Sequence, residues 1–338
     1  MDPAVYLAGM PSSLGQGRGP DPRIAPWAGW TTGGLDQAVA WDSVFCFLRA
    51  IAAPQPNQPR RIFIFEAPGG ATQQYQAMQL LLSDTAQFGP ALVEWFAQRA
   101  LGRWPRAALP LKGRHVFICT HGGRDRCCGR YGYPFYRQAS ALVSTLETEG
   151  LLPTNWVQTW QVSHISGHRF APTLVDLPEG RYYGALTLED WRSLLLHQGA
   201  LELLSRVYRG WAYLPELAQA VERLLWQQQG WQWLGKSLSY QQLSTEVQQR
   251  TLPATGQSSV QANVQTWQIS LTWGSSHTWQ ASIQSDPSRQ RSILGSCGHE
   301  SLTQIEQYQV MRLKQLKCDL IPGGMKARAE PSLVQLKS

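Results

Sequence analysis

Short apolar runs alternate with amphipathic runs through the middle of the chain. Residues 114–118 contain a continuous apolar run that predicts a buried strand, and residues 134–149 place their apolar side chains on one helical face. Pro134 suits the first turn of that helix, and Gly150 suits its end. Residues 156–162 alternate between apolar and polar side chains, so a second strand is expected there.

A hairpin and a helix follow this second strand. Residues 173–175 and 182–186 flank a turn at residues 178–180, which is hairpin chemistry, and Thr187 can cap a helix that runs to Leu196. The order strand, helix, strand, hairpin, helix matches a thioredoxin-like topology. We therefore expect a compact α/β sandwich in the middle of the chain.

The N-terminal part shows a weaker pattern of the same kind. Apolar positions at helical spacing predict an amphipathic helix over residues 36–53, and residues 61–65 read as a short buried strand. Residues 73–82 and 91–101 are expected to be helices. These elements predict a small α/β unit.

The composition shifts to Gln and Trp from about Tyr213 onward. A helix is expected over residues 215–228, and the tail after Ile321 is expected to be loose. Alternating segments predict strands at 260–273, 278–283 and 291–294. This region therefore reads as an α+β extension.

The whole chain is predicted to be an α/β protein of three units. Residues 1–110 form a smaller N-terminal α/β half, and residues 111–212 form a domain of thioredoxin-like topology. Residues 213–338 form the C-terminal extension with its loose tail. With 338 residues, each unit is long enough to bury a core.

Composition narrows the class of protein. Apolar residues make up 43% of the chain and charged residues 16%, which argues against global disorder. Apolar runs are all far shorter than the ~20 residues of a membrane-spanning helix, and the N-terminus lacks the pattern of a secretory signal. We therefore expect a cytoplasmic protein without structural disulfides, in which clustered members of its six cysteines are candidates for metal or redox chemistry.

Positive charge is concentrated before and within the predicted helix at 134–149. The chain carries a net charge of +7, and residues 101–140 hold eight basic residues against Asp125 alone. The eight are Arg103, Arg106, Lys112, Arg114, Arg124, Arg126, Arg130 and Arg137. Such a strip suits an anionic ligand, an acidic protein or nucleic acid, and nucleic acid is the least favoured because it would need exposed interleaved tyrosines.

Four soft metal donors follow the two predicted strands. Cys119 and Cys128 are separated by eight residues, and His164 and His168 by three. Neighbouring strands would bring both loops to one edge of the sheet. Thiolate and imidazole donors favour zinc or an iron-sulfur cluster over hard cations. Zinc pairs are usually two to four residues apart, so the wide loop favours a 2Fe-2S cluster, with zinc and a metal-free loop as alternatives.

The residues around these donors resemble a known family. Cys119-Thr-His-Gly-Gly-Arg-Asp-Arg-Cys-Cys128-Gly129, followed by His164-Ile-Ser-Gly-His168-Arg-Phe-Ala171, is similar to the paired signature of the sucrase/ferredoxin-like proteins. The resemblance is strong over about residues 111–187, weaker over about 60–110 and absent after about 213. It implies that residues 111–212 are a thioredoxin-like ferredoxin domain with one 2Fe-2S cluster, and that the N-terminal half, residues 1–110, is thioredoxin-like as well.

The resemblance also implies a ligand set. Cys119 and Cys128 would bind one iron, and His164 and His168 the other. Cys128 is preferred to the adjacent Cys127 because it directly precedes Gly129, as the family's second cysteine does. The other cysteines and histidines are expected to be ordinary packing or surface residues: Cys46, Cys297, Cys318, His115, His197, His277 and His299.

Charged residues in the two loops predict how the site would behave. Arg124, Arg126 and Arg169 should stabilise a reduced, more negative cluster, whereas Asp125 should pair with an arginine and fix the loop. No catalytic acid/base or nucleophile set is identified, so a redox carrier is favoured over an enzyme. Its expected partner is an acidic redox protein, a ferredoxin or a flavoprotein reductase. The alternative function is a zinc-binding or metal-free interaction module.

Overall fold

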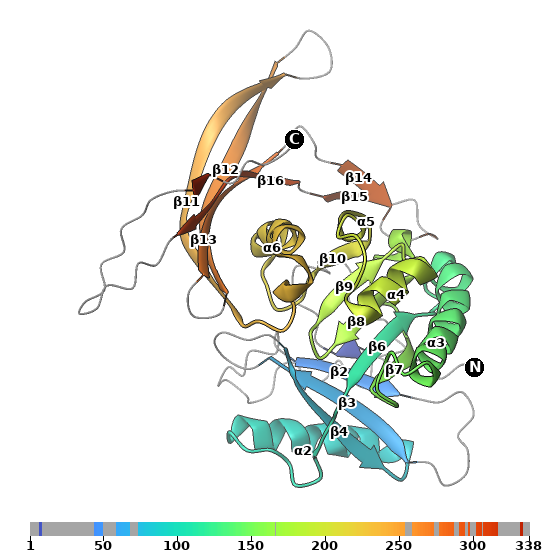
Figure 1. Ribbon diagram of the computed structural model, residues 1–338. Coiled ribbons are helices and arrows are strands. Elements are labelled where there is room, and N and C mark those ends of the chain that lie inside the picture. Colours follow the sequence, from blue (N-terminus) through green and yellow to red (C-terminus); the bar gives the residue numbers. More distant parts are fainter. Residues whose placement is uncertain are drawn as a thin grey trace, which may run out of the picture.

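The computed structural model arranges the chain around three larger sheets (Figure 1). It describes residues 7–8, 44–49, 59–67, 74–165, 167–253, 259–273, 277–286, 291–294, 297, 302–305, 307–316 and 332–333. The tail that was expected to be loose lies outside these residues, apart from residues 332–333. Each of the three sheets has five strands, and a separate pair of strands forms a small fourth sheet.

The middle sheet has the strand order β10-β9-β8-β6-β7. Its strands are β6 (Arg114–Cys119), β7 (Val157–Val162), β8 (Thr173–Leu177), β9 (Arg181–Gly184) and β10 (Tyr208–Trp211). β6 and β7 are parallel and are joined by α3 (Tyr133–Thr148), whereas β8 and β9 form an antiparallel hairpin beside β6. Helices α4 (Leu188–Leu196) and α5 (Leu203–Val207) follow. This arrangement confirms the predicted thioredoxin-like unit.

Local chemistry explains two of these elements. Thr187 caps α4 in a capping box, because its side chain accepts from the Asp190 N–H while the Asp190 carboxylate accepts from the Thr187 N–H. At the start of β6, Arg114 Nε donates to Asp176 Oδ1 of β8 over 2.9 Å. Arg114 is therefore a structural residue of the sheet. It does not belong to an exposed basic strip, although the sequence analysis counted it among the basic residues of 101–140.

The N-terminal sheet corrects two sequence predictions. Its described strands are β1 (Leu7–Ala8), β2 (Val44–Arg49), β3 (Arg60–Glu66), β4 (Gln76–Leu82) and β5 (Leu109–Pro110), in that order. The helices predicted over 36–53 and 73–82 are thus replaced by β2 and β4 where the structure describes them. Both segments have apolar residues at helical and strand spacing alike, and antiparallel pairing with β3 decides for strands.

A helix covers this sheet, as predicted. After the short η4 (Thr85–Gln87), α2 (Phe88–Ala100) packs Trp95 against Ile62 and Ile64 of β3. All described strand pairs of the sheet are antiparallel. The parallel pair that a thioredoxin-like N-terminal half would need is therefore not among the described residues of this α/β unit.

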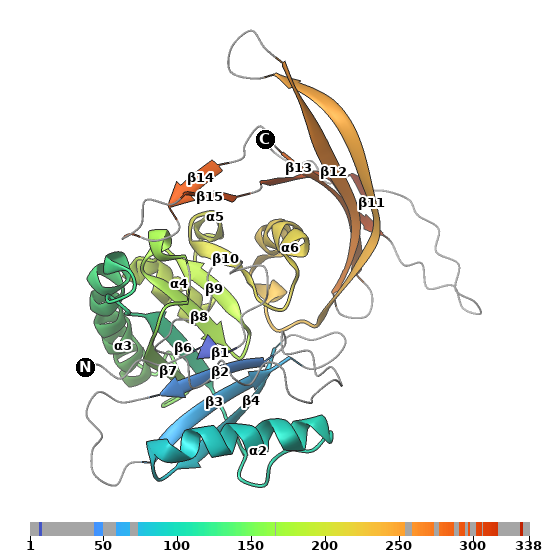
Figure 2. The same cartoon turned by 180° about the vertical axis from the view of Figure 1, so that it is seen from behind.

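The C-terminal region is a curved sheet with a helix on its concave side (Figures 1 and 2). The helix is α6 (Glu216–Gln229), followed by η7 (Gly230–Trp233). The sheet comprises β11 (Leu238–Pro253), β12 (Ser259–Trp273), β13 (His277–Ser285), β16 (Tyr308–Leu316) and β17 (Ser332–Leu333), and a hairpin adds β14 (Arg291–Leu294) and β15 (Leu302–Ile305). The predicted helix and three predicted strands are confirmed. The sequence analysis did not predict β11 and β16.

One hydrophobic core joins the middle unit to the C-terminal region. A single cluster of buried side chains runs from Val116 in β6 through Trp226 in α6 to Leu313 in β16. A continuous core therefore spans the predicted boundary at residue 212. The three predicted domain ranges stay a prediction. Within the described residues, no helix is long and apolar enough to span a bilayer.

Candidate metal centre

Parallel pairing of β6 and β7 brings the two predicted loops together. Cys119, the last residue of β6, pairs with Val162, the last residue of β7. The Thr120 N–H extends the ladder by donating to the Val162 carbonyl over 3.2 Å. The loop that carries Cys128 and the loop that carries His164 and His168 therefore leave the sheet at the same edge.

Three of the four predicted ligands converge at this edge. One sulfur each from Cys119 and Cys128 and one ring nitrogen of His164 lie within 4.8 Å of one another. Both cysteines are fully buried and belong to an apolar cluster with Phe117 and Val162. The site is thus a buried pair of thiols with a partly exposed imidazole at its rim.

A hydrogen bond links the two buried thiols. The pKa of Cys119 is lowered, mainly because it accepts a hydrogen bond from Cys128, and burial opposes this shift. The pKa of Cys128 is raised by the same hydrogen bond and by burial. Backbone hydrogen bonds from His121 and Ile165 further stabilise negative charge on the Cys119 sulfur. The pair therefore favours one thiolate, which is the metal-binding form of cysteine.

His168 lies in a second group of donors beside the first. Its Nδ1 is 3.1 Å from the Sγ of Cys297 and 3.5 Å from the Sγ of Cys127. Together with Asp125, these residues have ligand atoms within 4.8 Å of one another. Cys297, which was expected to be an ordinary packing or surface residue, is exposed and lies beside a predicted ligand.

Asp125 stands between the two groups. Its Oδ2 is 3.3 Å from Nδ1 of His164, and its Oδ1 is 3.8 Å from Nδ1 of His168. The side chain is 1% exposed, and its Oδ1 also accepts from the backbone N–H of Cys297 over 2.7 Å. Asp125 thus links both histidines and the C-terminal region; its predicted pairing with a loop arginine stays a prediction.

Glycines allow the Cys119–Cys128 loop to fold tightly onto the sheet edge. A Cβ on Gly129 would lie 2.8 Å from the Cα of Gly122, and a Cβ on Gly132 would collide with the Cys119 carbonyl oxygen. Gly129 and Gly132 lie in η5 (Cys128–Gly132), the turn that leads into α3. The glycine after Cys128 therefore serves the close approach of the loop to itself.

The loop arginines point to solvent. Arg124, Arg126 and Arg130 are exposed around the site, and Arg169 is exposed within η6 (His168–Phe170). The Nη1 of Arg169 donates to the Leu294 carbonyl of β14 over 3.4 Å. Positive charge thus surrounds the buried thiols without an arginine entering the donor groups.

The donor set fits a metal with soft ligands. Two thiols and one imidazole converge, and the second imidazole borders the same carboxylate. The ring of His168 faces the C-terminal region through both nitrogens, since its Nε2 is 3.3 Å from the Leu294 carbonyl oxygen. As a ligand, His168 would exchange one of these contacts for the metal.

The region around this site is similar to known proteins. The sucrase/ferredoxin-like family model matches residues 43–210. The chain is 32% identical over 102 residues to altered inheritance of mitochondria protein 32 of Meyerozyma guilliermondii, a match that covers 28% of this chain and 34% of the relative. The chain therefore spans about a third of that relative's length.

Two solved structures of a thioredoxin-like [2Fe-2S] ferredoxin from Aquifex aeolicus are also similar. The first is 19% identical with a TM-score of 0.24 and covers 31% of this chain and 98% of that one. The second, a cysteine-to-serine variant, is 22% identical with a TM-score of 0.21 and covers 24% and 82%. With the signature loops and the thioredoxin-like strand order in place, the match over residues 43–210 shows that the chain belongs to the sucrase/ferredoxin-like family.

Proposed function

We propose that this protein is a one-electron carrier in which Cys119, Cys128, His164 and His168 hold a 2Fe-2S cluster. The observation that carries the proposal is the convergence of Cys119, Cys128 and His164 within 4.8 Å at one sheet edge. The signature of the family and its ferredoxin-like description support it. When bound, such a cluster supplies a centre that accepts and returns one electron.

The residues around the thiols favour the uptake of negative charge. Hydrogen bonds from the backbone at His121 and Ile165 stabilise charge on the Cys119 sulfur. Exposed Arg124 and Arg126 add positive charge to the same loop. Reduction by one electron makes the centre more negative, so these groups favour the reduced protein and raise its potential.

The two histidines differ in their access to solvent. The side chain of His164 is 24% exposed, whereas that of His168 is 6% exposed. A metal-binding imidazole keeps a proton on its second nitrogen, and a neighbouring carboxylate orients that ring. With Asp125 Oδ2 at 3.3 Å from its Nδ1, the His164 ring is oriented by this carboxylate and can hold such a proton there. Electron uptake would then be coupled to proton uptake.

A potentiometric titration at several pH values tests this function. The midpoint potential should fall as the pH rises between about 6 and about 10, because proton uptake accompanies reduction. His164→Cys adds a thiolate charge, so it should lower the potential and weaken its dependence on pH. A wild-type potential that stays flat over this range would contradict proton coupling through His164.

Exchange of electrons with an acidic protein completes the proposal. Arg124, Arg126 and Arg130 are exposed around the buried thiols, so an acidic ferredoxin or flavoprotein reductase would be steered toward this face. The cytoplasm, expected from the sequence, is the proposed location. The relative from Meyerozyma guilliermondii carries a name that refers to mitochondria, so a fractionation experiment should compare the two compartments.

A structural zinc site is the second candidate function. Three soft donors within 4.8 Å also suit Zn²⁺, which takes four ligands in structural sites. Such a protein would be colourless and would accept no electron. Metal analysis separates the two functions.

A further inference from the structure

Two cysteines outside the proposed ligand set lie next to each other. Cys127 and Cys297 are 170 positions apart in the sequence, yet their sulfur atoms are 2.7 Å apart. Cys127 belongs to the loop between β6 and α3, whereas Cys297 follows β14 in the C-terminal region. Both are free thiols. This contact joins two parts of the chain that the sequence gives no reason to connect.

Polar contacts hold the two segments in this arrangement without help from the sulfurs. The backbone N–H of Cys297 donates to Oδ1 of Asp125 over 2.7 Å. Asp125 lies two residues before Cys127 in the sequence. Three residues before Cys297, the Leu294 carbonyl oxygen lies 3.3 Å from Nε2 of His168 and accepts from Arg169 Nη1 over 3.4 Å. The thiol pair is therefore positioned by the backbone around it.

The pair is also accessible to a small reagent. Cys297 is exposed, Cys127 is partly exposed, and both line a cavity of about 330 Å³ beside Tyr131 and Arg169. By contrast, Cys119 and Cys128 are fully buried. A small disulfide can therefore reach Cys297 before it reaches the buried thiols.

We propose that Cys127 and Cys297 form a reversible disulfide that fastens the C-terminal region to the rim of the metal centre. Their sulfur separation is about 0.7 Å longer than the ~2.05 Å bond of a disulfide. Two thiolates on one tetrahedral zinc ion would stand about 3.8 Å apart, given Zn–S bonds of about 2.3 Å. The geometry therefore favours a covalent bond over a metal bridge.

Thiol–disulfide exchange with a small disulfide such as oxidised glutathione supplies the oxidant. The Cys297 thiolate attacks one glutathione sulfur, forms a mixed disulfide and releases one glutathione thiolate. The Cys127 thiolate then attacks the Cys297 sulfur, forms the Cys127–Cys297 bond and releases the second glutathione thiolate. The two protons lost by the protein thiols are taken up by the two glutathione thiolates, and two electrons pass from the protein to glutathione.

The bond would act on the segment that covers a proposed ligand. His168 contacts both Cys297 and Leu294, so closing the disulfide fixes this segment over the imidazole. Reduction would leave only the hydrogen bonds to hold it. In a reducing compartment, disulfides of this kind are transient and sense the redox state.

The test is a redox titration of the full-length protein, purified without oxygen, in mixtures of reduced and oxidised glutathione. After alkylation of the remaining thiols and digestion, mass spectrometry should find one Cys127–Cys297 cross-linked peptide under oxidising conditions. Dithiothreitol should abolish the peptide. Cys297→Ser should remove it, whereas Cys318→Ser, a second cysteine of the C-terminal region, should leave it at the wild-type yield.

Three results would overturn the proposal. In the first, Cys127 and Cys297 stay fully alkylated under every glutathione ratio. In the second, oxidation links other cysteines, such as Cys119 and Cys128, in the wild type and in Cys297→Ser alike. In the third, one zinc ion per chain protects both thiols and is lost in Cys297→Ser. The first result is measured on the wild type alone, so the test remains valid even if a variant fails to fold. The test also remains valid if the protein proves to hold no 2Fe-2S cluster, because it detects only the Cys127–Cys297 bond.

Discussion

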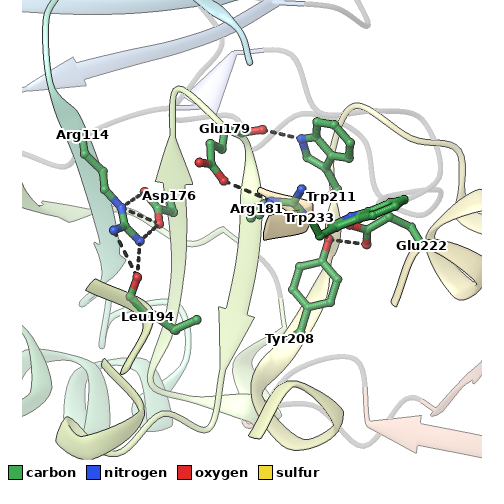
Figure 3. Close-up of polar contacts among 9 residues, drawn as sticks. All are labelled: Arg114, Asp176, Glu179, Arg181, Leu194, Tyr208, Trp211, Glu222 and Trp233. Carbon is green, nitrogen blue, oxygen red and sulfur yellow. Dashed lines mark hydrogen bonds and ion pairs between the residues drawn. The ribbon is translucent and has the colours of Figure 1, made fainter. Parts of the chain in front are cut away.

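Arg181 of β9 and Glu222 of α6 form an ion pair in the interior, with 2.7 Å between Nη1 and Oε1. Their side chains are 3% and 0% exposed. Figure 3 shows how Tyr208 and Trp233 complete the arrangement: Tyr208 Oη donates to Glu222 Oε2 over 2.8 Å and Trp233 Nε1 to Oε1 over 2.7 Å. The pair therefore connects the thioredoxin-like sheet to the C-terminal region through a satisfied polar network.

Glu222→Gln should destabilise the protein strongly. The substitution keeps the side-chain volume but leaves the buried guanidinium of Arg181 with Glu179 as its remaining carboxylate partner, 3.1 Å from its Nε. Breaking a buried pair costs up to about 3–5 kcal/mol, and Glu179 lessens that loss. Urea denaturation of wild type and variant, with the free energy of unfolding as readout, measures the effect.

The matched control is Glu246→Gln on β11, where the side chain is exposed. Its free energy of unfolding should stay within about 0.5 kcal/mol of wild type. A loss below about 1 kcal/mol in Glu222→Gln would show that the pair does not hold the two parts of the chain together.

Stability should also depend on pH through His115. Burial lowers the pKa of this histidine, which accepts from Trp160 Nε1 at Nδ1 over 3.1 Å and lies with Nε2 3.1 Å from the Lys112 carbonyl oxygen. The neutral ring satisfies both contacts. As the pH falls below about 6.5, the unfolded chain takes up a proton that the folded chain refuses, so stability is lost toward low pH.

His115→Gln should remove this part of the pH dependence. Between about pH 7.5 and about pH 5.5 the wild type should lose up to about 1.4 kcal/mol more than the variant. His277→Gln, which replaces an exposed histidine of β13, is the control. Equal pH dependence of the free energy of unfolding in wild type and His115→Gln would contradict the account.

Cys127 and Cys128 should differ sharply as cluster ligands. Cys128 lies in the buried group with Cys119 and His164, whereas Cys127 lies in the group with Cys297. Cys128→Ser should therefore lose the visible absorption of the protein or shift its spectrum, and Cys127→Ser should retain most of the wild-type iron. The opposite outcome in absorption spectra of the two variants would indicate that Cys127, and not Cys128, is the ligand.

Electron transfer to an acidic partner should slow as salt rises. Exposed charges act mainly on association and are screened over about 8 Å at physiological ionic strength. Replacing Arg124 and Arg126 by Ser should lower the association rate at low salt and flatten its salt dependence. The same change at Arg103 and Arg106, which are exposed in the segment between α2 and β5, should have the smaller effect. A wild-type electron-transfer rate that is independent of salt would contradict a role of these arginines in docking an acidic partner.

Much of the middle unit could be predicted because its local signals agree with its tertiary structure. The apolar run of β6, the helical face of α3 and the Thr187 cap each point to the element that forms. The N-terminal strands β2 and β4 could not be predicted, because their apolar residues fit both spacings and only pairing with β3 distinguishes them.

The sequence was sufficient to predict the two ligand loops of the site, but not the contribution of the C-terminal region. The loops of Cys119 and Cys128 and of His164 each follow a strand, and these two strands were expected to be neighbours, so the convergence of the three residues could be anticipated. Cys297 could not, because its approach to Cys127 depends on how the curved C-terminal sheet packs on α6 and β10. Its hydrogen bond to Asp125 leaves no trace in the local sequence pattern.

The central claim is that Cys119, Cys128, His164 and His168 hold a 2Fe-2S cluster. The most direct measurement is iron, zinc and acid-labile sulfide analysis of anaerobically purified protein, with EPR spectroscopy after one-electron reduction. The account predicts about two iron and two sulfide per chain and a paramagnetic signal in the reduced protein. About one zinc per chain, with neither iron nor a signal, would contradict it.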